Sequence, residues 1–157
     1  MPTRQITPRL SKTSISLQAF NKEVLIQLLI QSKTNGFTVD NSRIFGAPDL
    51  AFPKQKLAIV LYKCEVHQCP RCIKKNKIVP LSQIKDTLLF KEISKTVIED
   101  EKYENKFVNS HSWGLLTVWD CQLVDTPLRV LNSIRAYLLL PILTGEEEEK
   151  LLTLRVK

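Results

Sequence analysis

Apolar side chains recur along the chain with spacings that predict both helices and strands. From Ser16 to about Lys33 they fall every three or four positions, the spacing of an amphipathic helix, and Asn35-Gly36 is a typical end for it. The run Leu57–Tyr62 is apolar almost throughout, as in a strand covered on both faces. Shorter segments with strand character are Phe37–Val39, Asp49–Phe52 and Gly114–Trp119.

Two more helices are predicted in the second half of the chain. A long amphipathic helix is expected from Leu81 or Ser82 to about Phe107, with a break near Asp100. Thr126-Pro127 predicts the start of another, running to about Leu140, because a hydroxyl cap followed by proline is typical of a first helical turn. This order predicts one α/β domain with a central mixed sheet flanked by helices.

The two ends of the chain differ in character from this domain, which is expected over residues 15–143. Residues 1–14 are polar and basic and predict a flexible arm; its cations Arg4, Arg9 and Lys12 could contact a DNA backbone, although an ordinary frayed terminus is an equal alternative. Residues 144–157 predict an acidic helix or tail, in which Glu146–Glu149 form a solvated face.

Composition favours a nucleic-acid partner and excludes some other classes. The formal net charge is +7, which attracts polyanions and favours a nucleic acid as partner over a merely soluble basic protein. Four glycines in the whole chain leave no glycine-rich phosphate loop. With no secretory signal and no apolar run near the roughly 20 residues of a membrane helix, the expected location is cytoplasmic, without a membrane.

The cysteines predict a structural zinc site. Cys64, Cys69 and Cys72 lie within nine residues, and Cys121 directly follows the predicted strand at Gly114–Trp119. Zinc prefers four such ligands at tetrahedral corners, and short spacings supply several of them from one turn. His67 is a competing ligand, since C-x2-H-x-C is also sterically reasonable, and free buried thiols are the structural alternative.

A second candidate site begins at Pro48-Asp49. With Leu61-Tyr62-Lys63 on the next strand, it resembles the nuclease pattern P-D…(D/E)-x-K, in which groups on two strands hold Mg²⁺ against the scissile phosphate. Leu61 occupies the second carboxylate position, so only its backbone carbonyl could bind the metal.

The chain as a whole resembles the very-short-patch-repair endonucleases, which belong to the PD-(D/E)xK nuclease superfamily. The resemblance covers about three quarters of the chain and rests on four segments. These are NKEVLIQLL around Glu23, GAPDLAFPKQKLAIVLYKCEVHQCPRC, FKEISKTVIED and SWGLLTVWDCQL. It implies a restriction-endonuclease-like fold, double-stranded DNA as the nucleic-acid partner, and Mg²⁺-dependent hydrolysis of DNA phosphodiester bonds, in mismatch repair or restriction.

The resemblance also implies roles for individual residues. Asp49 would bind Mg²⁺ together with the carbonyl of Leu61, and His67 would be the general base for the attacking water. Glu23 matches a helix acid that approaches the metal waters, and Asp100 falls where the family keeps another acid near the site. Lys63 would assist as the lysine of the wider motif, and the zinc ligands would be Cys64, Cys69, Cys72 and Cys121.

Several positions depart from the family pattern. Glu65 and Val66 stand where the family places an aromatic pair that wedges into mismatched DNA, which puts thymine–guanine recognition in doubt. Lys63 replaces a usual glycine, and Tyr62 replaces a residue that is often histidine or aspartate.

Leu61, Glu65 and Val66 favour a second hypothesis, a zinc-stabilised DNA-binding module without catalysis. A third hypothesis is a subunit that cuts one strand within a larger restriction enzyme, since 157 residues leave little room for a separate recognition domain. A partner subunit or repair protein would fit this third hypothesis.

Overall fold

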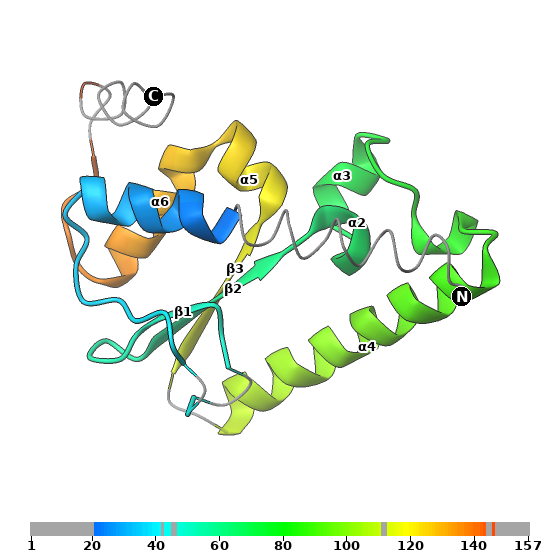
Figure 1. Ribbon diagram of the computed structural model, residues 1–157, viewed down its shortest axis with the longest axis horizontal. Helices are drawn as coiled ribbons and strands as arrows, with labels where there is room; N and C mark the ends of the chain where they lie inside the picture. Colours follow the sequence, from blue (N-terminus) through cyan, green and yellow to red (C-terminus); the bar gives the residue numbers. More distant parts are fainter. Residues whose placement is uncertain (1–20, 42, 45–46, 111–112, 144–145, 147–157) are drawn as a thin grey trace.

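Three strands form one mixed sheet at the centre of the computed structural model, which describes residues 21–41, 43–44, 47–110, 113–143 and 146. The strands are β1 (Leu50–Phe52), β2 (Leu57–Tyr62) and β3 (Gly114–Trp119), in the order β1-β2-β3 (Figure 1). β1 is antiparallel to β2, and β2 is parallel to β3. All six residues of β2 are buried, as expected for the middle strand.

Helices connect and cover these strands. The parallel pairing of β2 with β3 needs a long crossover, and the chain supplies it with α2 (Cys64–His67), α3 (Pro70–Lys74), the 3₁₀ helix η1 (Leu81–Gln83) and α4 (Thr87–Ser110). After β3 come α5 (Asp120–Asp125) and α6 (Pro127–Tyr137). Residues 21–31 are also helical.

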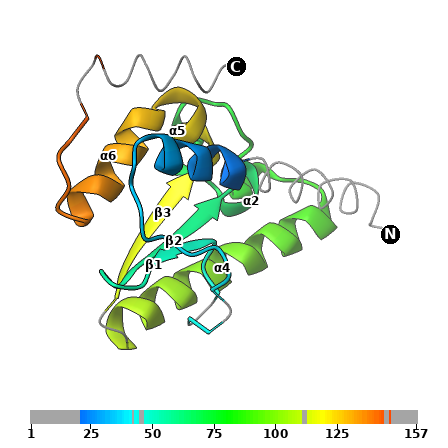
Figure 2. The same ribbon diagram turned by 60° about the vertical axis from the view of Figure 1, so that its left-hand side comes forward.

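The helices lie on both faces of the sheet. α4 runs along one face, while the helix over residues 21–31 and α6 lie on the other (Figures 1 and 2). The alternate β2 residues Leu57, Ile59 and Leu61 point into the second layer, because successive strand side chains point to opposite faces. There they pack in the main apolar core with Leu25, Leu29, Leu131 and Ile134.

The structure confirms an α/β fold with a mixed sheet, and β2 and β3 have the predicted bounds. The predicted strand at Phe37–Val39 is reduced to one bridge between Thr38 and Ala51. The reason is local: the side-chain amide of Asn41 donates to the Thr38 carbonyl (3.1 Å) and so turns the chain away from β1.

Helix ends account for most other differences. α4 begins at Thr87, where the Asp86 carboxylate accepts the Leu89 N–H (3.0 Å) and caps the first turn. The predicted break near Asp100 is wrong, since α4 continues without interruption to Ser110. α6 ends at Tyr137 and not near Leu140, and α2, α3 and α5 are too short to give a periodic signal.

Three predictions lie wholly or partly outside the described residues. They are the basic arm over residues 1–14, with Arg4, Arg9 and Lys12, the start of the first helix over residues 16–20, and the tail over 144–157 apart from residue 146. Among the helices that the structure describes, none combines the length and apolar character needed to cross a bilayer.

Candidate functional site

The four cysteines come together as a group that could hold a metal ion. The sulfur atoms of Cys64, Cys69, Cys72 and Cys121 all lie within 4.8 Å of one another, and those of Cys69 and Cys121 are 3.8 Å apart. A tetrahedral zinc site with Zn–S bonds of about 2.3 Å has sulfur–sulfur edges of about 3.8 Å. The spacing and the four-thiol donor set therefore both fit zinc.

The strand register explains why Cys121 joins the three clustered cysteines. Tyr62 pairs with Trp119 at the ends of the parallel strands β2 and β3, so the chain leaves both strands at one edge of the sheet. Cys64 and Cys121 each come two residues after these ends. The remaining two cysteines arrive through the turn into α3.

Burial and nearby polar groups shift the pKa values of the cysteine thiols in different directions. Burial raises the pKa of Cys64, and it raises that of Cys72 to about 11. Burial would also raise the pKa of Cys69, but hydrogen bonds led by the backbone N–H groups of Cys72 and Arg71 lower it overall. The Arg71 guanidinium lies 3.7 Å from the Cys121 sulfur. This cation would offset part of the negative charge of four thiolates around zinc.

Asp120 links the cysteine cluster to the end of β2. Its carboxylate accepts hydrogen bonds from the backbone N–H (3.2 Å) and the thiol (2.5 Å) of Cys64. The ammonium of Lys63 lies 3.9 Å from the other oxygen of the same carboxylate. Cys64 is the donor in the thiol–carboxylate hydrogen bond, so zinc binding would require loss of its proton.

Asp49 lies where the pairing of β1 with β2 stops. Continuing the register from the Leu50–Ile59 pair would place Pro48 opposite Leu61, but proline has no N–H to donate to the Leu61 carbonyl. The Asp49 carboxylate instead accepts the Leu61 N–H through Oδ2 (2.7 Å). The Pro48-Asp49 pair therefore ends the ladder and puts a carboxylate at the backbone of β2.

The Leu61 carbonyl belongs to the same corner. In a strand the N–H and C=O of one residue point to the same side, so this carbonyl is directed toward the end of β1 together with the N–H that Asp49 binds. One carboxylate and one carbonyl are few ligands, but Mg²⁺ commonly keeps several waters and adds phosphate oxygens. Carboxylate and carbonyl oxygens are ligand types that Mg²⁺ takes, so these two groups could form part of such a site.

Nearby polar and charged groups partly offset the effect of burial on the pKa of Asp49. Burial raises the pKa of Asp49, while the Leu61 N–H and the charges of Lys22 and His67 partly offset the rise. The pKa of Tyr103 is raised by its own burial and by the Asp49 charge. Neither Lys22 nor Tyr103 is identifiable from the sequence, since each belongs to a helix with ordinary amphipathic spacing.

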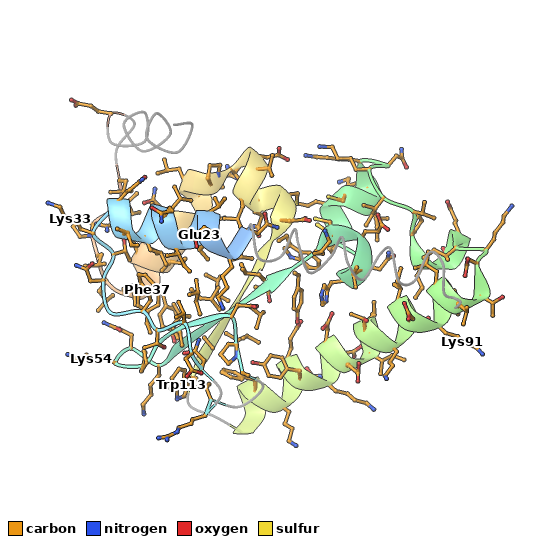
Figure 3. All side chains as sticks on the ribbon, viewed as in Figure 1. Glu23, Lys33, Phe37, Lys54, Lys91 and Trp113 are labelled. Atoms are coloured by element: carbon orange, nitrogen blue, oxygen red, sulfur yellow. The ribbon has the colours of Figure 1, made fainter. Side chains whose placement is uncertain are left out.

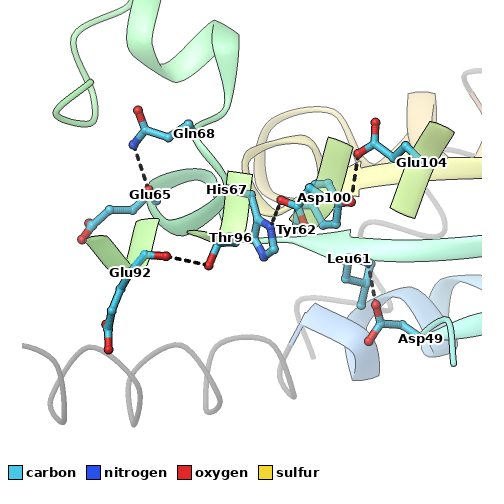
Figure 4. A network of polar contacts seen from close by, with 10 residues as sticks. All are labelled: Asp49, Leu61, Tyr62, Glu65, His67, Gln68, Glu92, Thr96, Asp100 and Glu104. Carbon is cyan, nitrogen blue, oxygen red and sulfur yellow. Dashed lines mark hydrogen bonds and ion pairs between the residues drawn. The ribbon is translucent and has the colours of Figure 1, made fainter. Parts of the chain in front are cut away.

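His67 is held on two sides. Its Nδ1 lies 2.5 Å from an Asp100 carboxylate oxygen, and its ring stacks on Tyr62 with centroids 4.1 Å apart and planes 2° from parallel (Figure 4). The Tyr62 hydroxyl donates to Glu104 (2.9 Å), and burial, followed by the Asp100 and Glu104 carboxylates, raises the pKa of this phenol. Glu104 follows Asp100 by one helical turn, a spacing that could have marked it in the sequence.

This arrangement assigns different tasks to the two ring nitrogens. A carboxylate at Nδ1 favours a proton on that nitrogen, which leaves the lone pair of a neutral ring at Nε2. Figure 4 shows this second nitrogen directed away from Asp100. The ring can therefore accept a proton at Nε2 while Asp100 stabilises the resulting charge.

Two further residues proposed for catalysis, Lys63 and Glu23, have partners of their own. Lys63 is buried and forms its ion pair with Asp120, beside the cysteine cluster. Glu23 is exposed on its helix (Figure 3) and accepts a hydrogen bond from Gln27 (3.1 Å). His67 is not a member of the metal-binding group found in the described part of the chain, which contains the four cysteines.

Neither a comparison with models of known protein families nor a search of curated proteins finds a match to this chain.

Proposed function

We propose that this protein is a Mg²⁺-dependent DNA endonuclease of the very-short-patch-repair type, with a restriction-endonuclease-like fold. The observation that supports this most is the pairing of Asp49 with the backbone of Leu61, within electrostatic reach of an oriented imidazole at His67. The net charge of +7 supports DNA as the substrate.

The metal ligands would be the Asp49 carboxylate and the Leu61 carbonyl. Mg²⁺ bound there would supply charge stabilisation to the phosphate oxygens and acidify the attacking water. The hydrogen bond from the Leu61 N–H orients the carboxylate before any metal arrives. Lys22 adds a nearby positive charge that favours the ionised, metal-binding form of Asp49.

His67 would accept the proton of the attacking water at Nε2. The water oxygen would bond to phosphorus, the bond from phosphorus to one bridging oxygen would break, and this leaving oxygen would take a proton from solvent to become the hydroxyl at the nick. Asp100 stabilises the imidazolium that forms, and the Tyr62 ring holds the imidazole plane. The four cysteines would hold a structural zinc ion that fixes α2, the helix that carries both Cys64 and His67.

A plasmid-nicking assay tests the proposal. Incubation of supercoiled plasmid with the purified protein and Mg²⁺ is expected to give open circles, and EDTA is expected to prevent this. Asp49→Asn keeps the size of the side chain but removes the charge that binds the metal, so we expect nicking to fall at least about 100-fold. The exposed Asp40 is the matched control, and Asp40→Asn is expected to leave the rate unchanged. Equal rates for both variants would remove Asp49 from the mechanism.

A binding-only function is the second candidate, because two observations favour it. Lys63 forms its ion pair with Asp120, and the Glu23 carboxylate accepts its hydrogen bond from Gln27, so both have partners other than Asp49. A DNA-binding module would bind duplex DNA but would not nick it in the presence of any divalent metal.

A mismatch-bearing duplex tests specificity. Repeating the nicking assay with it separates mismatch-repair activity from general cleavage, since Glu65 and Val66 replace the usual aromatic pair.

A further inference from the structure

A basic pocket lies between α3 and α5, on the outer side of the cysteine cluster. Cys72 and Cys121 form part of its wall, so the pocket shares two residues with the cluster. Its lining includes one carboxylate, from Asp125. Four cationic side chains surround it: Arg71, Lys75, Lys77 and Arg129.

The cations are only weakly compensated by the protein. Lys77 and Asp125 are 4.0 Å apart, and about half of each side chain is exposed (55% and 51%), so solvent screens this pair. Arg71 points toward sulfur atoms of the cluster. Lys75 and Arg129 are exposed, and the described residues provide no ion-pair partner within 4.0 Å of either. The excess positive charge in a concave surface is suited to an anionic ligand.

We propose that this pocket binds phosphate groups of a DNA backbone, as a contact separate from the Asp49–His67 site. The inference rests on the DNA-binding part of the proposed function, but not on cleavage. It assigns a role to a surface of α3, α5 and α6 that the hydrolytic mechanism does not use.

The exposure of the cations favours a polymer over a small anion. Exposed charges bind a single phosphate weakly, because water and salt screen each pair. A DNA strand presents several phosphates at once and gains free energy from the counterions that it releases. The cysteine cluster also connects the pocket to the catalytic residues, since Cys64 and His67 are the two ends of α2. Backbone contacts at the pocket would therefore help to set the position of the strand at His67.

The test measures duplex binding without cleavage. Fluorescence anisotropy of a labelled duplex is followed over a range of salt concentrations in an Asp49→Asn background, without added divalent metal. The double variant Lys75→Ala/Arg129→Ala removes two phosphate contacts. We expect its affinity to fall about 10- to 100-fold at low salt, and the slope of log K against log salt to decrease by about 2.

A matched pair of cations elsewhere controls for net charge. Lys54 in the β1–β2 turn and Lys91 on α4 are exposed and lie away from α3 and α5 (Figure 3). Lys54→Ala/Lys91→Ala is expected to change the slope by less than half as much. Zinc content and thermal unfolding of both double variants confirm that the fold is retained. Equal losses in the two double variants would overturn the proposal.

A second variant should change affinity in the opposite direction. Asp125→Asn removes the one carboxylate found among the described residues that line the pocket, and it releases Lys77 from its ion pair. We expect duplex affinity to rise about threefold or more, a gain that an unfolded variant could not produce. Asp40→Asn removes the same charge from an exposed position elsewhere and is expected to have a smaller effect.

The outcomes separate the two proposals. If the duplex binds tightly and its affinity does not change on substitution of Lys75, Arg129 or Asp125, the pocket proposal is overturned and the nuclease proposal stays intact. Absence of duplex binding by the parent protein overturns both. Loss of inorganic phosphate or mononucleotide binding in Lys75→Ala/Arg129→Ala, with duplex binding retained, would instead identify a small-anion site and overturn the DNA assignment.

Discussion

Single residues decide where the sheet ends and the candidate site begins. Pro48 cannot donate a ladder hydrogen bond, and Asp49 occupies the backbone N–H of Leu61 that pairing would otherwise use. On the other side of the site, Asp100 orients the His67 ring through Nδ1. The Asp49 carboxylate therefore faces β2, and the His67 imidazole has its Nε2 atom available.

The raised pKa of Asp49 predicts a stability cost that depends on pH. Burial makes the folded protein hold the Asp49 proton more tightly than the unfolded chain, whose ordinary value is 3.8. The contribution of this tightly held proton to the free energy of unfolding is complete below pH 3.8 and is lost as the pH rises through the pKa of Asp49 in the folded protein. At neutral pH and without metal, Asp49→Asn should therefore raise the melting temperature, and the difference should disappear near pH 3.8.

Thermal unfolding of both proteins between pH 3.5 and 8 checks this sign. Asp40→Asn is the control, because Asp40 is exposed. A melting temperature for Asp49→Asn below that of the parent at pH 7 would contradict a desolvated carboxylate. Addition of Mg²⁺ should stabilise the parent and not Asp49→Asn, since a ligand stabilises only the form that binds it.

At the scale of elements, the short helix α2 links the cysteine cluster to the candidate catalytic site. α2 has four residues, and a helix of this length has little stability of its own. Cys64 at its start belongs to the cluster, and His67 at its end belongs to the candidate catalytic site. Trp119 packs against the cluster and meets the Tyr62 ring edge-on (5.2 Å), which gives a second link between the two sites.

We therefore expect removal of the proposed zinc ion to disable nicking, although zinc is not proposed to bind Asp49. A chelator of high zinc affinity, or Cys121→Ser, is expected to lower the free energy of unfolding by several kcal/mol, because metal binding and folding are coupled in such sites. Nicking with saturating Mg²⁺ should fall at least about tenfold, and zinc alone should restore the chelated parent. Full nicking by protein shown to lack zinc would contradict this coupling.

At the scale of the whole molecule, one buried cation joins distant parts of the second helical layer. The Arg135 guanidinium donates to the Ser32 carbonyl (3.1 Å) and the Thr34 hydroxyl (2.9 Å), more than 100 residues away in the chain. It also donates to the Pro141 carbonyl (2.8 Å). These bonds connect α6 to the end of the helix over residues 21–31, in addition to the apolar packing between the two helices.

Arg135→Ala is expected to destabilise the protein by about 2–4 kcal/mol, because it leaves buried acceptors without donors. Urea unfolding measures the change, and Arg129→Ala is the matched control, since Arg129 is exposed on the same helix. A change of less than about 0.5 kcal/mol for Arg135→Ala would show that water replaces these hydrogen bonds.

What the sequence determined by itself is local. The apolar run Leu57–Tyr62 predicted β2, and the β-branched and aromatic content of Gly114–Trp119 predicted β3, both with their observed bounds. Each of these signals lies within its own segment. The cysteine spacing predicted a cluster, since three of its members come from one short segment. The alternation of elements also predicted the α/β class and the mixed sheet.

Only the tertiary structure decided which side chains meet. The ion pair of Lys63 with Asp120 and the contact of His67 with Asp100 join segments that are far apart in the sequence. The pocket between α3 and α5 likewise exists because β2 and β3 end at the same edge of the sheet. Such contacts follow from register and layer packing, which the spacing of residues along one segment does not encode.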